Sequence, residues 1–384
     1  MGPIRVLHIL HSMNRGGAEN AIMNYYRNLD HSKVQFDFLL TAKDKCQFED
    51  EIERLGGRVF RVPQMTIRNP FPYLKGVLRF FKEHKEYRIV HSHTSSKSFF
   101  PLYLARKAGI PVRICHSHNT KTEQGTSGRI RNLLKFPLRM VATDYCACGE
   151  EAAVWLYGKA LVESGRVMIV PNVIEAGLFD YEPSVRARIR KEMGVPDSTV
   201  ILGCTARFND QKNHRFLISL FNEFHRMVCD SRLLLIGDGR LRNDIQSQVD
   251  DLGLRNSVVF TGVVPNVAEY EQAMDFFMLP SINEGIPLSL IEAQISGLRC
   301  FASEGVPRES DKTGLVSFIP LEKGPKYWAD SVVSSIGYER RSRIDDINKA
   351  GYNAPTASRR LQFYYQKRYS DIDQLDHDSV RTDQ

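Results

Sequence analysis

Short apolar runs alternate along the chain with stretches of helical spacing. The first run, residues 4–10, predicts a buried strand, and a polar turn with two glycines follows it. Residues 18–29 then place apolar side chains on one helical face. The alternation continues with strands expected at 36–40, 58–62, 88–91 and 112–115, and with helices at 48–55 and 73–84. Such alternation indicates a parallel sheet covered by helices on both faces.

A second series of the same kind follows residue 175. Its expected strands are 199–205, 232–236, 258–260 and 276–279, and its expected helices are 215–228, 241–252, 267–274 and 288–296. The chain length suits two domains, so we expect an α/β protein with one Rossmann-like domain over 1–175 and another over 176–354. Ligands of such sheets bind beyond the carboxyl ends of the strands, which predicts a cleft between the domains. A helix is expected at 355–370, before a disordered tail at 371–384.

Composition excludes several classes of protein. Hydrophobic residues make up 42% and charged residues 25% of the chain, which is typical of a globular protein. No run is long and apolar enough to span a membrane, the first residues do not resemble a signal peptide, and the seven cysteines are scattered. We therefore expect a cytoplasmic protein with reduced thiols.

The positive charge is concentrated in the first half of the chain. Residues 1–175 contain 26 Lys and Arg against 16 Asp and Glu, a balance of +10, whereas residues 176–384 contain 26 against 29, a balance of −3. This asymmetry predicts an anionic partner for the first domain, either nucleic acid or an acidic phospholipid surface.

The segment 284–292 carries the clearest candidate chemistry. It follows an apolar strand and a short turn, and Pro287 suits the start of a helix that ends near Gly297. Free N–H groups at a helix start bind phosphate. The N–H groups expected to do so are those of Gly285, Ile286 and Leu288, and Pro287, which has none, completes the expected donor site. Glu284 and Glu292 would hold hydroxyl groups on either side of a diphosphate, although a capped helix with two surface glutamates is favoured when this spacing is taken alone.

Two further loops follow predicted strands. Arg207 and Lys212 follow the first strand of the second domain, where a pair of cations suits a diphosphate leaving group, and two solvated loop charges are an equal alternative. Gly16 and Gly17 follow the first strand of the chain, where they let the backbone approach a ligand closely or simply form a left-handed turn.

Histidines occur in two pairs, each at the end of a predicted strand. His91 and His93 form one pair, and His116 and His118 the other, and alternation places both members of a pair on one face. Four imidazoles could bind zinc, but no acidic or thiolate side chain accompanies them. We therefore favour one histidine pointing into the cleft and hydrogen bonds for the others, and we expect no metal site.

Two other signals are weaker. Gly237 and Gly239 resemble part of a dinucleotide-binding motif, but Arg242 occupies the place of its third glycine. Residues 128–140 combine apolar side chains with four basic ones and no acid, which suits either an anionic membrane surface or a solvated helix that Pro137 would interrupt. The basic residues are Arg129, Arg131, Lys135 and Arg139.

Together these segments resemble the retaining GT-B glycosyltransferases of family 4, and among them the bacterial enzymes of capsular and exopolysaccharide synthesis. The resemblance extends along nearly the whole chain, and the order and spacing of its motifs make it specific. The motifs are residues 16–19, 113–120, 170–173, 207–212, 235–239, 259–262 and 275–292. Two positions depart from the family pattern, which could alter the sugar preference: Asn119 stands where relatives frequently carry Asp, and residues 303–307 replace a glycine pair.

The resemblance implies roles for the matching residues. Glu284 is similar to the carboxylate that holds the donor sugar, and His118 to the histidine at the transferred sugar, so we expect these two to be catalytic. Glu292 is similar to the residue that binds the nucleotide ribose, and Arg207 and Lys212 to the diphosphate clamp. Gly16-Gly17 is similar to the loop near the phosphate and the acceptor. The resemblance also implies that the helix at 355–370 crosses back to pack on the first domain. The family needs neither a metal nor a cofactor, and the departing phosphate is thought to help deprotonate the acceptor on the same face of the sugar.

We therefore expect a retaining glycosyltransferase of surface polysaccharide synthesis. It would move a sugar from a nucleotide-sugar, with a UDP-sugar as the expected donor, to a glycan or lipid-linked acceptor. The basic first domain would let it rest on the inner face of the cell membrane. A nucleotide-sugar-binding protein that does not transfer is the alternative. An NAD-dependent oxidoreductase depends only on Gly237 and Gly239, and nucleic acid as a partner is disfavoured because no recognition module accompanies the basic charge.

Overall fold

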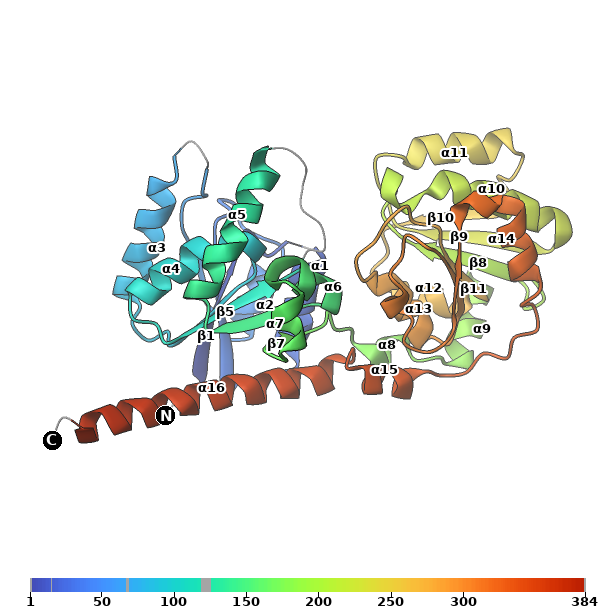
Figure 1. Cartoon of the computed structure of the whole chain (residues 1–384). Helices are drawn as coiled ribbons and strands as arrows, with labels where there is room; N and C mark the ends of the chain where they lie inside the picture. Colours follow the sequence, from blue (N-terminus) through green and yellow to red (C-terminus); the bar gives the residue numbers. More distant parts are fainter. Residues whose placement is uncertain (1, 15, 67–68, 119–125, 383–384) are drawn as a thin grey trace. The chain divides into compact units, whose positions relative to one another are not determined.

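The computed structural model describes residues 2–14, 16–66, 69–118 and 126–382, with 126–131 and 375–382 described by their backbone only. The chain divides into two compact units (Figure 1). Unit 1 consists of Met1–Val173 and Asn353–Gln384, and unit 2 of Ile174–Tyr352. Unit 2 is therefore an insertion within the chain of unit 1.

Unit 1 is built on a seven-stranded parallel sheet with the order β3-β2-β1-β4-β5-β6-β7. Its strands are β1 (Ile4–Leu10), β2 (Val34–Leu40), β3 (Val59–Arg61), β4 (Ile89–Ser92), β5 (Val112–Ser117), β6 (Asp144–Ala147) and β7 (Val167–Ile169). Its helices are α1 (Gly17–Arg27), α2 (Glu49–Arg54), α3 (Phe71–Glu83), α4 (Phe99–Lys107), α5 (Thr126–Val141), α6 (Glu150–Tyr157), α7 (Lys159–Glu163) and α16 (Ala354–Thr382).

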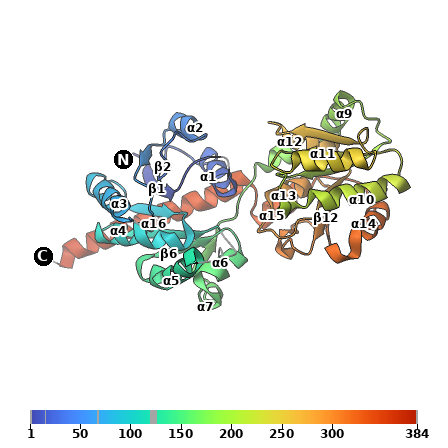
Figure 2. The ribbon, with the colours of Figure 1, turned by 90° about the horizontal axis from the view of Figure 1, so that it is seen from above.

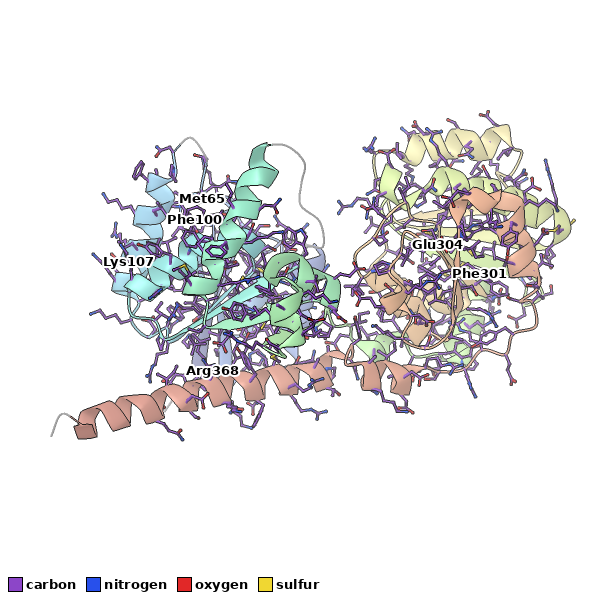
Figure 3. All side chains as sticks on the ribbon, in the orientation of Figure 1. Met65, Phe100, Lys107, Phe301, Glu304 and Arg368 are labelled. Atoms are coloured by element: carbon purple, nitrogen blue, oxygen red, sulfur yellow. The ribbon has the colours of Figure 1, made fainter. Side chains whose placement is uncertain are left out.

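Helices cover both faces of this sheet, which is why its central strands are nearly continuous apolar runs. Side chains of α1, α2 and α16 pack on one face, and side chains of α3, α4, α5 and α6 pack on the other (Figure 2). On the first face Tyr365 and Leu361 of α16 are buried against the strands. Arg368 of the same helix forms a 2.8 Å ion pair with Asp144 of β6 (Figure 3). The C-terminal helix therefore forms part of the core of unit 1.

Unit 2 has a six-stranded parallel sheet with the order β10-β9-β8-β11-β12-β13. Its strands are β8 (Val200–Thr205), β9 (Ser231–Ile236), β10 (Val258–Gly262), β11 (Phe276–Leu279), β12 (Arg299–Ser303) and β13 (Val316–Ile319). Its helices are α8 (Ala176–Phe179), α9 (Pro183–Glu192), α10 (His214–Met227), α11 (Arg242–Asp251), α12 (Val267–Ala273), α13 (Leu288–Ile295), α14 (Gly324–Val333) and α15 (Ile344–Ala350). Buried residues of α10, α11 and α14 pack on one face and those of α13 on the other. The two sheets confirm the predicted pair of Rossmann-like α/β folds.

Two expectations about helices differ from the structure. Pro137 lies inside a continuous α5. A proline removes only the one hydrogen bond that its own N–H would donate to the carbonyl four residues earlier. That carbonyl belongs to Leu133, a residue that is 75% exposed. The tail expected to be disordered from residue 371 continues α16 as far as Thr382. Ile372 is buried against unit 1 and Asp373 pairs with Arg88, which gives the start of this stretch a tertiary anchor.

The structure has no helix, among the described residues, with the length and apolar character needed to cross a membrane. All seven cysteines are free, and six of them are buried.

Candidate functional site

The loops after β8 and β11 bring two predicted site residues into contact. These strands are neighbours in the sheet of unit 2, so their carboxyl ends lie side by side. The Lys212 ammonium lies 2.6 Å from the Glu284 carboxylate, and both side chains are largely buried. Gln211 donates a second, 3.2 Å hydrogen bond to the same carboxylate and a 2.9 Å bond to the Asn283 carbonyl. Glu284 is therefore held in place by two residues of the β8 loop.

The start of α13 offers unpaired backbone donors beside this pair. Within the described part of the chain, the amides of Gly285, Ile286 and Leu288 donate to no backbone carbonyl. Pro287 caps the helix and has no N–H group to offer. The Glu284 amide, in contrast, donates to the Gly305 carbonyl at 2.9 Å, which fixes the loop from its other side. Free amides next to a lysine form a site suited to a phosphate group.

Glu292 lies one turn inside α13, and its environment contains a carboxyl group that the sequence did not identify. Burial raises the pKa of Glu292 to about 7. Glu271 at the end of α12 is fully buried, and its pKa is raised by burial and by the charge of Glu292. One oxygen of Glu271 accepts a 2.8 Å bond from Thr205, and the other has no hydrogen-bond partner. Two coupled carboxyls at this point make the protonation of Glu292 sensitive to pH near neutrality.

The weak dinucleotide-like motif has a structural explanation. Gly237 has a φ of +131°, and a Cβ there would lie 2.2 Å from the Ala206 carbonyl oxygen. A Cβ on Gly239 would lie 2.5 Å from the Phe208 carbonyl oxygen. Both glycines are thus required because the β8 and β9 loops pack closely, with the Phe208 amide donating to the Asp238 carbonyl at 3.0 Å.

This packing positions Arg207, which lies between Ala206 and Phe208. Its side chain is exposed, and among the described residues it makes no hydrogen bond or ion pair. Arg207 is therefore free to bind an anion, whereas Lys212 already has a partner.

In unit 1 the predicted glycines begin α1 at the carboxyl end of β1. Gly16 is the N-cap, with an extended φ of −132°, and Gly17 is the first helical residue, so neither of these two glycines adopts the left-handed turn considered from the sequence. The next two residues, Ala18 and Glu19, line a pocket of about 610 Å³ at the carboxyl ends of β1, β2 and β4, and burial raises the pKa of the Glu19 carboxyl. Polar and apolar side chains line this pocket together, among them Thr41, Met65 (Figure 3), Lys97, His118 and Trp155.

Five histidines lie together next to this pocket, on the face of the sheet that α1 and α16 cover. We call them the histidine cluster: His8, His91, His93, His116 and His118. They enclose, with apolar neighbours, a cavity of about 10 Å³. The sequence singled out four of them and missed His8, although it interrupts an otherwise apolar strand and lies opposite His91 in the sheet.

The cluster consists of two hydrogen-bonded rows of rings. In one row Tyr365 bonds His91 at 2.7 Å, and His91 bonds His116 at 3.2 Å. In the other, His93 lies 2.9 Å from His8 and 2.8 Å from His118. The rows stack, with ring centroids 4.3 Å apart for His91 and His93 and 4.0 Å apart for His116 and His118. Bonds among the histidines and to Tyr365 thus satisfy most of these polar atoms, where the sequence had led us to expect loop hydrogen bonds.

Burial keeps the cluster uncharged. It lowers the pKa of His8 to about 3 and that of His118 to about 4. The pKa values of His91, His93 and His116 are also lowered, first by burial and then by the proximity of the other imidazoles. These side chains are therefore neutral at physiological pH.

Two of the four basic residues predicted to face a membrane are directed toward the protein instead. Lys135 donates to the Trp155 carbonyl at 2.9 Å and lies 3.9 Å above the Trp155 ring, and Arg139 donates to the Tyr157 carbonyl. The side chains of Arg129 and Arg131, like the family departure Asn119, lie outside the described residues. Arg139 stays exposed, as do three apolar side chains of α5: Leu133, Phe136 and Met140 are 75%, 77% and 67% exposed.

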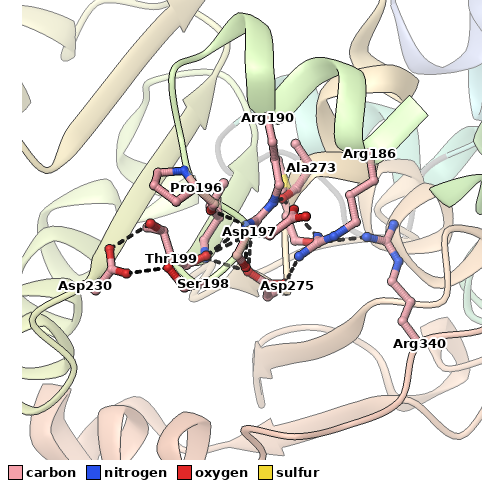
Figure 4. Close-up of polar contacts among 12 residues, drawn as sticks. Arg186, Arg190, Pro196, Asp197, Ser198, Thr199, Asp230, Ala273, Asp275 and Arg340 are labelled. Carbon is pink, nitrogen blue, oxygen red and sulfur yellow. Dashed lines mark hydrogen bonds and ion pairs between the residues drawn. The ribbon is translucent and has the colours of Figure 1, made fainter. Parts of the chain in front are cut away.

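Unit 2 has a hollow of about 380 Å³ at the amino ends of β8 and β11. Three arginines at this hollow are hydrogen-bonded to the protein (Figure 4). Asp275 accepts 2.7 Å bonds from both Arg186 and Arg190, and Arg190 also donates to the Thr199 carbonyl. Arg340 donates to the carbonyls of residues 272 and 274. These bonds occupy the three arginines and leave little positive charge there for a ligand.

Family models match both units. Residues 16–173 match "Glycosyl transferase 4-like domain", and residues 199–336 match "Glycosyl transferases group 1". EpsF of Bacillus subtilis, named as a glycosyltransferase, is 38% identical over 91% of this chain and 93% of its own length. An Escherichia coli UDP-Gal:α-D-GlcNAc-diphosphoundecaprenol α-1,3-galactosyltransferase is 24% identical over 78% of this chain and 79% of its own.

Solved structures agree on the fold. Anabaena HepE, crystallised in complex with UDP, superposes with a TM-score of 0.71 over 98% of this chain and all of its own, at 17% identity. The two parallel sheets, the order of the motifs and these matches lead to one conclusion: the chain belongs to the GT-B glycosyltransferases of family 4.

Proposed function

We propose that this glycosyltransferase moves a sugar, with retention of its anomeric configuration, from a UDP-sugar to a glycan or lipid-linked acceptor in surface polysaccharide synthesis. The observation that carries the proposal is the Lys212–Glu284 contact beside the free amides at the start of α13. A cation, a carboxylate and unpaired amides match the three parts of a sugar diphosphate that must be held, namely the phosphate charge, a sugar hydroxyl and the phosphate oxygens.

The chemistry requires stabilisation of a leaving group. As the bond between the sugar and the diphosphate breaks, the diphosphate gains negative charge. Arg207, Lys212 and the amides of Gly285 and Ile286 would stabilise it. The departing phosphate oxygen accepts the proton of the acceptor hydroxyl on the same sugar face, so the new bond keeps the configuration of the old one. These cationic and amide groups perform the task that a metal ion performs elsewhere, and we propose that transfer needs neither a metal nor a cofactor.

The remaining contacts follow from the same assignment. Glu284 would hold the donor sugar and Glu292 the ribose. In unit 1, His118 would contact the transferred sugar, and the pocket lined by Ala18 and Glu19 would take the acceptor. Gly16 and Gly17 would lie near the phosphate and the acceptor. UDP as the nucleotide of the donor is supported by two comparisons, since the E. coli relative uses UDP-galactose and HepE binds UDP. The E. coli relative also acts on a diphosphoundecaprenol-linked sugar, which supports a lipid-linked acceptor.

A panel of sugar nucleotides tests the proposal. A ligand that binds only the folded protein raises its melting temperature, so UDP-sugars should raise it more than GDP- or ADP-sugars. The preferred donor should then be hydrolysed slowly without an acceptor, in the presence of EDTA, and NMR of the released sugar should show the donor's anomer first. Donor binding without hydrolysis or transfer would instead identify a nucleotide-sugar-binding protein, and release of the opposite anomer would exclude retention.

We further propose that α5 rests on the cytoplasmic face of the membrane. Its exposed side chains Leu133, Phe136 and Met140 are three and four positions apart and so share one face of the helix, and the half of the chain that contains them carries a balance of +10. Apolar side chains next to basic charge are typical of helices that lie on anionic bilayers.

Vesicle flotation tests this orientation. Replacing Leu133, Phe136 and Met140 by serine should abolish binding to vesicles with anionic lipid and leave the donor-induced thermal shift unchanged. Phe363→Ser on α16, at a side chain that is 68% exposed, is the matched control and should bind as the unaltered chain does. Equal flotation of the triple variant would show that α5 is a solvated helix.

A further inference from the structure

The histidine cluster contains two groups of three imidazoles in metal-binding proximity. One group is His8, His91 and His93, and the other is His93, His116 and His118. In each group one nitrogen of every ring lies within 4.8 Å of the others. His8, His91 and His116 lie in the neighbouring strands β1, β4 and β5, and His93 and His118 are the first residues after β4 and β5.

Hydrogen bonding within the cluster leaves ligand atoms over. Among the described residues, His8 Nε2, His116 Nε2 and His118 Nδ1 are buried nitrogens without a hydrogen-bond partner. Neutral imidazole nitrogen is a common ligand of zinc and related ions, which it binds at about 2.0–2.1 Å. Two ligands of a tetrahedral ion at that distance stand roughly 3.4 Å apart. His93 Nδ1 and His118 Nε2 are 2.8 Å apart, so an ion could replace their shared proton after a shift of a few tenths of an ångström.

The surroundings favour the second group. Two of the three rings of the first group, His8 and His91, are 1% exposed, whereas the second group has one such ring, His116 at 3%. His93 and His118 line the pocket of about 610 Å³, from which an ion can enter and into which its fourth coordination position can open. The donors are all nitrogen, which excludes calcium and magnesium as the preferred ions.

We propose that His93, His116 and His118 form a binding site for a divalent first-row metal ion of the zinc type, open to the pocket at the carboxyl ends of β1 and β4. Binding moves the N–H proton of a coordinating nitrogen to the other nitrogen of its ring or to solvent, and a water molecule fills the fourth position.

The site has a consequence for transfer, which rests on the proposed function. His118 is the side chain proposed to contact the transferred sugar. An ion that coordinates His118 removes it from the sugar, so zinc should inhibit transfer rather than support it.

The test is a titration of the full-length, untagged, EDTA-treated and desalted protein with Zn²⁺ and with Co²⁺. We expect one ion per chain by calorimetry, and the visible absorption bands of four-coordinate cobalt. His118→Ala should weaken zinc binding by about 100-fold or more, because losing a direct ligand costs at least as much as losing an outer partner. His11→Ala is the matched control, since His11 lines the same pocket but belongs to neither group, and its affinity should equal that of the unaltered chain.

Several outcomes would overturn the site. These are the absence of a bound ion at 1 mM zinc, an unchanged affinity in His118→Ala, or fewer than two imidazole ligands by X-ray absorption of the zinc-loaded protein. The absorption measurement uses the unaltered chain, so it decides even where a variant fails to fold. Donor binding and hydrolysis are measured separately on metal-free protein. If the protein binds zinc but neither binds nor hydrolyses a donor, only the proposed function is refuted. If it binds and hydrolyses a donor but does not bind zinc, only the metal site is refuted.

Discussion

Lys212 has one partner in the structure, the Glu284 carboxylate, and a second in the proposed donor complex, the diphosphate. The pair is nearly neutral as it stands, so Lys212 adds little attraction for a distant anion. Arg207, exposed and without an ion-pair partner among the described residues, supplies that attraction and becomes the stronger stabiliser of leaving-group charge.

Arg207→Ala should therefore lower kcat/KM for transfer by about 10²–10³-fold, the range found when one donor to a developing oxyanion is removed. Steady-state assays with the preferred donor measure the change. Arg215→Ala is the control, because Arg215 is an exposed arginine of the following helix that pairs with Asp244. A loss of less than threefold in Arg207→Ala would remove this side chain from the mechanism.

The carboxyl pair Glu271 and Glu292 predicts a pH dependence of stability. Their folded pKa values lie above the usual 4.5, and that of Glu292 is about 7. The folded protein thus binds more protons than the unfolded chain, and the stability from this source is lost as the pH rises through 7. Glu271→Gln imitates the protonated carboxyl at every pH. Between pH 6.5 and 8.5 its free energy of unfolding should therefore fall by about 1–2 kcal/mol less than that of the unaltered chain. An equal change in the free energy of unfolding between the two pH values, in the variant and in the unaltered chain, would contradict this prediction.

At the scale of elements, strands β1, β4 and β5 place five neutral histidines inside unit 1. Their folded pKa values lie below 6.5, so the unfolded chain takes up protons that the folded unit does not, and stability falls as the pH drops below 6.5. Each histidine lowers the free energy of unfolding by about 1.4 kcal/mol per pH unit below pH 6.5. Together they are sufficient to unfold a domain of ordinary stability near pH 5.

The two tryptophans can test this, since Trp155 lies in α6 of unit 1 and Trp328 in α14 of unit 2. Fluorescence of Trp328→Phe, which keeps only Trp155, should report acid unfolding near pH 5. Fluorescence of Trp155→Phe, which keeps only Trp328, should change at lower pH. Simultaneous transitions, or a stable unit 1 at pH 4, would contradict the prediction.

A third element-scale prediction concerns the amino ends of β8 and β11 (Figure 4). Asp275 is the carboxylate that neutralises Arg190, whose side chain is only 2% exposed. Asp275→Ala leaves this cation without its charge partner and should cost unit 2 about 3 kcal/mol. Chemical denaturation followed at Trp328 measures the loss. Asp197→Ala, in the same hollow, should cost less than 1 kcal/mol, because its side chain forms no ion pair among the described residues.

Sequence patterns predicted the apolar strands well and the mixed ones poorly. Residues 4–10 and 276–279 coincide with β1 and β11, since a buried parallel strand is a recognisable apolar run. Strands β12 and β13 were missed, because β12 starts with Arg299 and Ser317 interrupts β13. The proximity of Lys212 and Glu284 depends on β8 and β11 being neighbours, and strand order is a property of the whole sheet. Glu271 carries no motif, and only its burial distinguishes it.

At the scale of the molecule, unit 1 is assembled from the two ends of the chain. Removing residues 353–384 would expose the apolar surface that Leu361, Tyr365 and Ile372 cover, and would leave His91 without the Tyr365 hydroxyl. We expect this truncation to destabilise unit 1 and to leave unit 2 folded. Hydrogen exchange measures both: protection should fall in β1 and β4 and stay unchanged in β8 and β11. Equal loss in both units would show that they fold as one.

The same discontinuity sets an order for synthesis on the ribosome. Domains generally fold as units while the chain emerges. Unit 2 has all of its residues once Tyr352 has left the exit tunnel, whereas unit 1, most of which is made first, still lacks α16. The first-made half must therefore wait, with part of its apolar face uncovered, until α16 has been made. Nascent chains stalled before α16 are the stage at which chaperones have the most exposed surface to bind.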